Sequence, residues 1–239
     1  QGRGHDGPGQ RRPAPYSDLS DSPRPRRCDR AHEVDRNNDV WLSGNGANSG
    51  AFSLVDGVTG AILRTEPSVG FGGYGGLVDK NGVIWSAHPL LRWDPSKPLT
   101  GANGVNWRGY THDSYGLCLD GANNVWNTSA TGGQIRKFSP SGDLLATASY
   151  GGAAAQGCVI DLSGDVWVAL SVGGVGVAHL DSLGRYRGTI TTPSGPTGVA
   201  VDAKGKVWST NFSAGTVSRI DPSKGIADPY GGRVGAVDL

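Results

Sequence analysis

The chain has 239 residues, 40 of them glycine, with 22 Lys and Arg against 21 Asp and Glu and a formal net charge of +1. This balance argues against a nucleic-acid-binding face, because the one basic cluster, RPRRCDR, lies in the N-terminal tail. No apolar run approaches the roughly 18 residues of a membrane helix. We therefore expect neither a nucleic-acid partner nor a membrane partner.

The first 30 residues differ in composition from the rest. They are rich in Pro, Gly, Arg and Asp and show no hydrophobic period. Such a segment buries too little apolar surface to offset its ordering entropy, so 1–30 is predicted to be a disordered tail. Methionine is absent, even at position 1. We expect the chain to be a fragment of a longer protein.

From residue 31 one phrase recurs five times, as VDRNNDVW, VDKNGVIW, LDGANNVW, IDLSGDVW and VDAKGKVW. In each, an aspartate is followed six residues later by a tryptophan. The period of about 41 residues, with strand signals and no helical period, is typical of one propeller blade per repeat. The aspartate is expected to cap the turn between two strands, and the tryptophan to anchor the packing between blades.

The sequence therefore predicts an all-β propeller over 31–239. It should contain about five four-stranded blades, near 31–70, 71–111, 112–152, 153–193 and 194–232. The last residues, 233–239, restart the phrase as GAVDL and predict the first strand of a sixth blade. That strand could replace the irregular first one or leave an edge open. An open edge predicts a homodimer, formed through the edge or by strand exchange.

The chain has three cysteines, Cys28, Cys118 and Cys158. An odd, low count does not indicate a disulfide framework, and no CxxC pair indicates zinc. Cys118 and Cys158 lie in the apolar strand patterns GLCLD and GCVID. We expect them to be small buried hydrophobes.

The repeat PTGVAVDAKGKVWSTNFSAGTVSRIDPSKG resembles those of the streptogramin (virginiamycin B) lyase-like and NHL-type propellers. The resemblance covers about 31–239. For the lyase family it implies ring-opening elimination by a glutamate and histidines, with a magnesium ion, near the channel. In that family the phrase after the tryptophan resembles WFTE. Here it reads WLSG, WSAH, WNTS, WVAL and WSTN, so only His88 stands where a functional side chain is expected.

The candidate ligand face of the propeller carries the loops that lead into each inner strand and those between the second and third strands. These loops are rich in glycine and aromatic residues. The candidate ligand-binding residues are Tyr74, Tyr115, Tyr150, Asn127 and Asn211. The candidate catalytic residues are His88, His112 and Asp113.

The same three residues could hold a divalent metal such as Ca, Mg or Zn, with amide oxygens completing the site. A bound ion would activate water toward an ester or phosphoryl group. In the alternative interpretation, His112 and Asp113 form a loop turn with a local hydrogen bond, and His88 and Pro89 form a tight turn. Both interpretations stay open at this point.

The leading functional hypothesis is a propeller that binds a small molecule or a protein on this face, outside the cell or in the bacterial cell envelope. The alternative is a metal-assisted, promiscuous hydrolase of activated esters, lactones or phosphotriesters. Lyase-type elimination ranks third, because the family's glutamate is missing after every repeated tryptophan. No GxSxG elbow indicates a nucleophilic serine.

Overall fold

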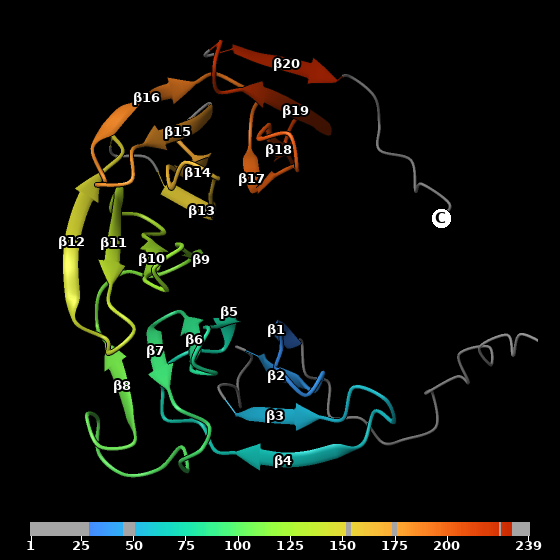
Figure 1. Ribbon diagram of the computed structural model, residues 1–239, viewed down its shortest axis with the longest axis vertical. Helices are drawn as coiled ribbons and strands as arrows, with labels where there is room; N and C mark the ends of the chain where they lie inside the picture. The colour runs from blue at the N-terminus through green and yellow to red at the C-terminus, as the bar shows by residue number, and fades with distance from the viewer. Residues whose placement is uncertain (1–28, 45–50, 152–153, 174–175, 225, 231–239) are drawn as a thin grey trace, which may run out of the picture.

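A computed structural model describes residues 29–44, 51–151, 154–173, 176–224 and 226–230. They form five four-stranded antiparallel sheets, in each of which the strands pair in chain order. Figure 1 shows the sheets arranged in an arc, with the first strand of each toward the centre and the fourth at the periphery. The predicted all-β propeller of about five four-stranded blades is confirmed.

The strands of each blade run from the centre outward. The first blade contains β1 (Asp29–Val34), β2 (Val40–Gly44), β3 (Phe52–Val55) and β4 (Ile62–Glu66). The second contains β5 (Tyr74–Val78), β6 (Ile84–Ala87), β7 (Leu90–Trp93) and β8 (Trp107–Tyr110). The third contains β9 (Leu117–Leu119), β10 (Val125–Thr128), β11 (Gln134–Phe138) and β12 (Leu144–Ser149). The fourth contains β13 (Ala154–Ile160), β14 (Val166–Val172), β15 (Gly176–Leu180) and β16 (Tyr186–Ile190), and the fifth contains β17 (Pro196–Val201), β18 (Val207–Asn211), β19 (Thr216–Asp221) and β20 (Ile226–Tyr230).

Both ends of the chain, 1–28 and 231–239, lie outside the described residues, and so do nearly all of the predicted tail and the strand predicted to begin a sixth blade. Within the described ranges, β1 and β17 are the inner strands at the two ends of the arc. The predicted homodimer through an open edge stays a prediction. No helix in the described part of the chain could span a membrane.

One hydrogen-bond pattern explains the aspartate of the repeated phrase. The Oδ1 atom of Asp202 accepts hydrogen bonds from the backbone N–H groups of Lys204 and Lys206, at 2.8 and 2.9 Å, and so caps the turn. Its Oδ2 atom accepts a hydrogen bond from Nε1 of Trp208 at 2.9 Å. The same bond joins Asp79 to Trp85, Asp120 to Trp126 and Asp161 to Trp167. One carboxylate thus serves both the turn and the indole, which fixes their spacing in the sequence.

A cationic side chain lies opposite this tryptophan on the third strand of three blades. The opposed pairs are Trp85 with Arg92, Trp126 with Lys137 and Trp208 with Arg219. Each cation lies within 6.0 Å of the centre of the indole ring, a cation–π arrangement. In the fourth blade His179 takes this place and stacks on Trp167 with ring centres 4.1 Å apart. Its Nε2 atom is also bonded to Asp165, which gives this histidine a structural role.

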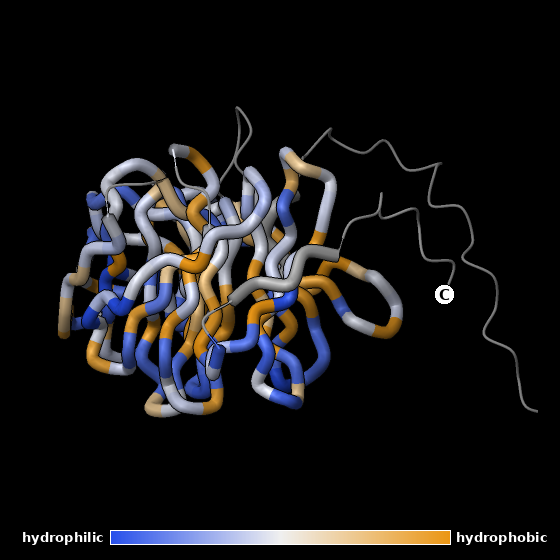
Figure 2. The backbone as a smooth tube through the Cα atoms, turned by 90° about the horizontal axis from the view of Figure 1, so that it is seen from above, coloured by the Kyte–Doolittle hydropathy of each residue, from blue (hydrophilic) through white to orange (hydrophobic). Residues whose placement is uncertain are grey.

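Most of the buried apolar side chains that the structure describes fall into four clusters. One joins Trp41 and Phe52 of the first blade to Trp93 of the second, and another joins Trp85 to Phe138 of the third. The remaining two clusters join the third blade to the fourth and the fourth to the fifth. Figure 2 shows hydrophobic stretches along the strands and hydrophilic ones at many of the turns. The core of the propeller therefore lies between neighbouring blades.

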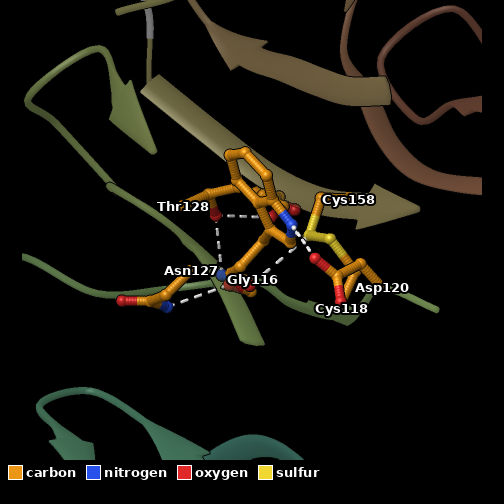
Figure 3. Close-up of a disulfide and its surroundings, with 8 residues drawn as sticks. Gly116, Cys118, Asp120, Asn127, Thr128 and Cys158 are labelled. Atoms are coloured by element: carbon orange, nitrogen blue, oxygen red, sulfur yellow. Dashed lines mark hydrogen bonds between the residues drawn. A yellow bond between two sulfur atoms is a disulfide. The ribbon is translucent and has the colours of Figure 1, made fainter. Parts of the chain in front are cut away.

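Cys118 on β9 and Cys158 on β13 form a disulfide with Cα atoms 5.7 Å apart (Figure 3). The expectation of two separate buried thiols is therefore wrong. Cys118 lies two residues before its turn aspartate, Asp120, whereas Cys158 lies three residues before Asp161. Successive side chains on a strand point to opposite faces. The one-residue offset therefore lets Cys118 face the fourth blade while Cys158 faces back toward the third.

Candidate functional site

A cavity of about 320 Å³ opens among the inner strands of four successive blades. Its walls come from the residues at the start of β5, β9, β13 and β17, at the end of each inner strand away from the aspartate turn. The lining residues are Tyr74, Gly75, Gly76, Tyr115, Gly116, Leu117, Gln156, Gly157 and Thr197. We call this space the axial cavity, because the inner strands surround the centre of the arc (Figure 1).

Four of the lining side chains occupy the same position in successive repeats. Tyr74, Tyr115, Gln156 and Thr197 each lie five residues before the turn aspartate of their blade. All four are half-buried. The propeller symmetry therefore brings the side chain at this repeat position to the same level of the axial cavity in each of the four blades.

The two tyrosines lie together on one side of the axial cavity. Their ring centres are 4.8 Å apart, and their hydroxyl groups are hydrogen-bonded to each other. The ring of His88 lies 5.8 Å from that of Tyr74. His88 is exposed, with a positive φ of 68° at the turn between β6 and β7, and it is not among the residues that line the cavity.

Gln156 and Thr197 were not among the residues predicted from the sequence. The repeat itself carries the signal, because both residues occupy the position that Tyr74 and Tyr115 hold in their own blades. Within the described ranges, the side-chain amide of Gln156 makes no hydrogen bond. It is therefore available to a ligand in the axial cavity.

His112 points into the third blade. Its Nε2 atom lies 2.8 Å from Oδ1 of Asn127, and its ring stacks on Phe138 with centres 5.5 Å apart. The amide nitrogen of Asn127 donates to the Gly116 carbonyl, so its oxygen faces His112 and Nε2 acts as the donor. Burial lowers the pKa of His112, although the bond with Asn127 acts in the opposite direction. His112 is accordingly a neutral hydrogen-bond donor near pH 7.

Asp113 organises the loop between β10 and β11. Its Oδ2 atom accepts hydrogen bonds from the Ser129 hydroxyl at 2.6 Å and from the backbone and hydroxyl groups of Thr131 at 2.6 and 2.8 Å. Partial burial would raise the pKa of Asp113, but the hydrogen bonds from Ser129 and Thr131 outweigh it and bring the value to about 2. The carboxylate is ionised, and its hydrogen bonds hold the loop between β10 and β11 in its conformation.

The other predicted residues are buried. Tyr150 is 1% exposed, and its hydroxyl donates to the Ser129 carbonyl at 3.0 Å, so it belongs to the core. Asn211 is also 1% exposed, and its amide nitrogen donates to the hydroxyls of Thr216 and Ser218. Of the residues predicted to bind ligand, the axial cavity brings together only Tyr74 and Tyr115.

The structure does not bring His88, His112 and Asp113 together. Among the residues that the structure describes, no three His, Cys, Asp or Glu side chains form a group that could hold a metal ion. The predicted metal site has no support from this geometry, and it stays a prediction.

No family model matches the sequence, and no curated protein does. Solved structures do match. Virginiamycin B lyase from Staphylococcus aureus superposes with a TM-score of 0.74 at 18% identity, covering 90% of this chain and 73% of that one. The catalytically inactive H270A form of that lyase, solved with quinupristin, gives 0.70 at 18% identity over 87% and 71% of the two chains.

A third match is the extracellular domain of the one component system BT4673 from B. thetaiotaomicron. It superposes with a TM-score of 0.59 at 17% identity, covering 86% of this chain and 31% of that one. At these identities the likeness concerns the fold. The chain has a lyase-like propeller fold, as the resemblance of its repeats implied.

Proposed function

We propose that the protein is a binding module whose axial cavity takes a small hydroxylated ring compound such as a sugar. The observation that carries the proposal is the lining itself. Two tyrosines, a glutamine and a threonine occupy one equivalent position in four successive blades, and glycines lie beside them.

The chemistry of the lining suits such a ligand. Tyrosine offers an apolar ring face and a polar hydroxyl, and the Gln156 amide and Thr197 hydroxyl supply directional hydrogen bonds. The lining contains no charged side chain among the described residues. Its volume of about 320 Å³ is at the small end of ligand sites, so one or two rings would fill it.

The test is binding of methyl glycosides and neutral disaccharides, measured by saturation-transfer NMR and calorimetry. We expect Tyr115→Ala to weaken binding about tenfold or more, a loss of about 1.4 kcal/mol. The matched control is Tyr186→Ala, because Tyr186 lies on the outer strand β16 and is 46% exposed. Circular dichroism establishes that both variants are folded.

Quinupristin belongs in the same panel, because a lyase of this fold was solved with it. If quinupristin binds and no glycoside does, the ligand class proposed here is wrong. If Tyr186→Ala weakens binding as much as Tyr115→Ala, the axial cavity is not the site.

The disulfide supports a location outside the cell or in the cell envelope, because disulfides persist in oxidising compartments. One of the structural matches is an extracellular domain. Metal-assisted hydrolysis and lyase-type elimination stay predictions of the sequence. The hydrogen bonds of Asp113 and Asn127 described above favour neither.

A further inference from the structure

Besides the apolar clusters, each blade junction brings one recurring pair of positions together on neighbouring inner strands. One member of the pair lies two residues before the turn aspartate of its blade. The other lies on the next blade, three residues before the turn aspartate of that blade. Cys118 and Cys158 form this pair covalently. The equivalent residues in the adjoining junctions are Leu77 with Leu117 and Val159 with Val199, and each pair borders one apolar cluster. In the first junction the pair is Glu33 with Gly76.

Glu33 therefore stands where the other described blades place an apolar side chain. A methyl group placed on Gly76 would lie 3.5 Å from Oε1 of Glu33 and 2.8 Å from the Trp85 carbonyl oxygen. A side chain at position 76 would clash with the Trp85 carbonyl oxygen, so the position requires glycine. The absence of a side chain also leaves room for the carboxyl group of Glu33. Since Gly76 lines the axial cavity, Glu33 lies directly behind the wall of that cavity.

The carboxyl group of Glu33 reaches the channel-facing edge of β5. The Val78 N–H lies near this carboxyl group and favours its ionised form. The next N–H, that of Asp79, bonds to the Val83 carbonyl on the hairpin side, and successive N–H groups on a strand point to opposite edges. Among the described strands, β5 pairs only with β6, so the edge that Glu33 faces is the one turned toward the centre of the arc.

No cation neutralises Glu33 among the described side chains. Its register partner on β2 is Trp41, and the carboxylate that follows β5, Asp79, is bonded to its own turn and to Trp85. Burial raises the pKa of Glu33 to about 8. The chain's other glutamate, Glu66, is by contrast paired with Arg64 and bonded to the Leu99 N–H.

We propose that Glu33 is the acidic recognition residue of the axial cavity and that the cavity's ligand carries a primary amine. This inference rests on the proposed function and narrows its ligand class to an amino sugar or a similar amine-bearing ring. On binding, the Glu33 carboxyl group would release its proton to solvent, and an ammonium group at Gly76 would give the resulting carboxylate the charge partner that it lacks in the described part of the protein. Charge-assisted hydrogen bonds of this kind are shorter and stronger than neutral ones.

The test compares methyl glucoside with its 6-amino-6-deoxy counterpart, which is protonated at pH 7. We expect the protein to bind the amine about tenfold more tightly or better. Glu33→Gln should reduce this preference to about twofold or less while the neutral glucoside still binds. The control Asp143→Asn makes the matching change from carboxyl to amide in an exposed turn and should keep the preference. Should Glu33→Gln not fold, Glu33→Asp, which draws the carboxylate back from Gly76, must reduce the preference.

The outcomes separate the two proposals. Equal binding of both glucosides, or a preference that survives in Glu33→Gln, overturns the role of Glu33 and leaves the cavity as a glycoside site. Binding of neither glucoside overturns both proposals.

An independent readout is the pH dependence of stability. Between the ordinary pKa of 4.5 and about 8, the folded state holds a proton on Glu33 that the unfolded state releases. The free energy of unfolding should therefore fall as the pH rises through this window. Denaturant titrations at pH 5 and pH 8.5 should show a smaller fall for Glu33→Gln than for the unchanged protein. An equal fall in both would show that the carboxyl group is not buried as described.

Discussion

Replacing Trp85 with alanine should lower the free energy of unfolding by about 3–5 kcal/mol. Trp85 is 0% exposed and packs with Val125 and Phe138 of the next blade. Its indole also donates to Asp79, which is 4% exposed and would be left with an unfilled acceptor position. The substitution therefore opens a cavity at a blade junction and removes a buried hydrogen bond. Urea denaturation followed by circular dichroism measures the loss.

The chain offers a matched control at the same repeat position. Trp208 makes the same hydrogen bond to its aspartate and lies under a cation, but it is only half-buried. We expect Trp208→Ala to cost distinctly less than Trp85→Ala, because less apolar area is lost from the core. Equal losses would show that the indole hydrogen bond, and not the packing between blades, makes this position important.

Removing the disulfide should be the second large effect. Cys118 and Cys158 are 40 residues apart, and the chain-entropy relation gives about 4 kcal/mol for closing such a loop in the unfolded state. We expect the double variant Cys118→Ala and Cys158→Ala, made with Cys28→Ser, to lose stability approaching that amount relative to Cys28→Ser alone. Guanidinium titrations of the two proteins, without reductant, give the difference.

Alkylation tests the bond directly. In denaturant without reductant, the unchanged protein should take up one alkyl group, on Cys28, and three after reduction. Uptake of three groups before reduction would contradict the disulfide. A double variant as stable as its Cys28→Ser parent would show that the bond, although formed, contributes little to the fold.

The repeat could be predicted from the sequence because its physics is local. Asp202 and Trp208 belong to one hairpin, so the turn cap and the indole bond leave a fixed spacing in the chain. Blade number, strand order and the structural role of the aspartates followed from that spacing. The cations opposite the tryptophans are equally regular, but they become visible only when the second and third strands are set in register.

Contacts between blades were not predictable in the same way. Recognising the bond between Cys118 and Cys158 required knowing that adjacent inner strands present opposite faces to each other. The candidate site shows the same limit. Tyr74 and Tyr115 were predicted as ligand-binding residues and do line the axial cavity. Side chains just after the tryptophans, such as Ser129 and Asn211, are instead buried in local hydrogen bonds.

The hydrogen bond between aspartate and indole has a consequence for how such a chain can grow. Each inner hairpin brings its own turn cap and its own aromatic anchor, so a duplicated segment of about 41 residues would arrive with its local conformation already specified. The duplicated segment would still need a residue on its inner strand that is complementary to the paired residue on the inner strand of the next blade. Where that pair is cysteine with cysteine the blades are joined covalently, and where it is Glu33 with Gly76 a carboxyl group is held beside the axial cavity. In a protein built this way, substituting the two residues of one such pair can give a blade junction a new chemical group. The hydrogen bonds of each inner hairpin are not affected by that change.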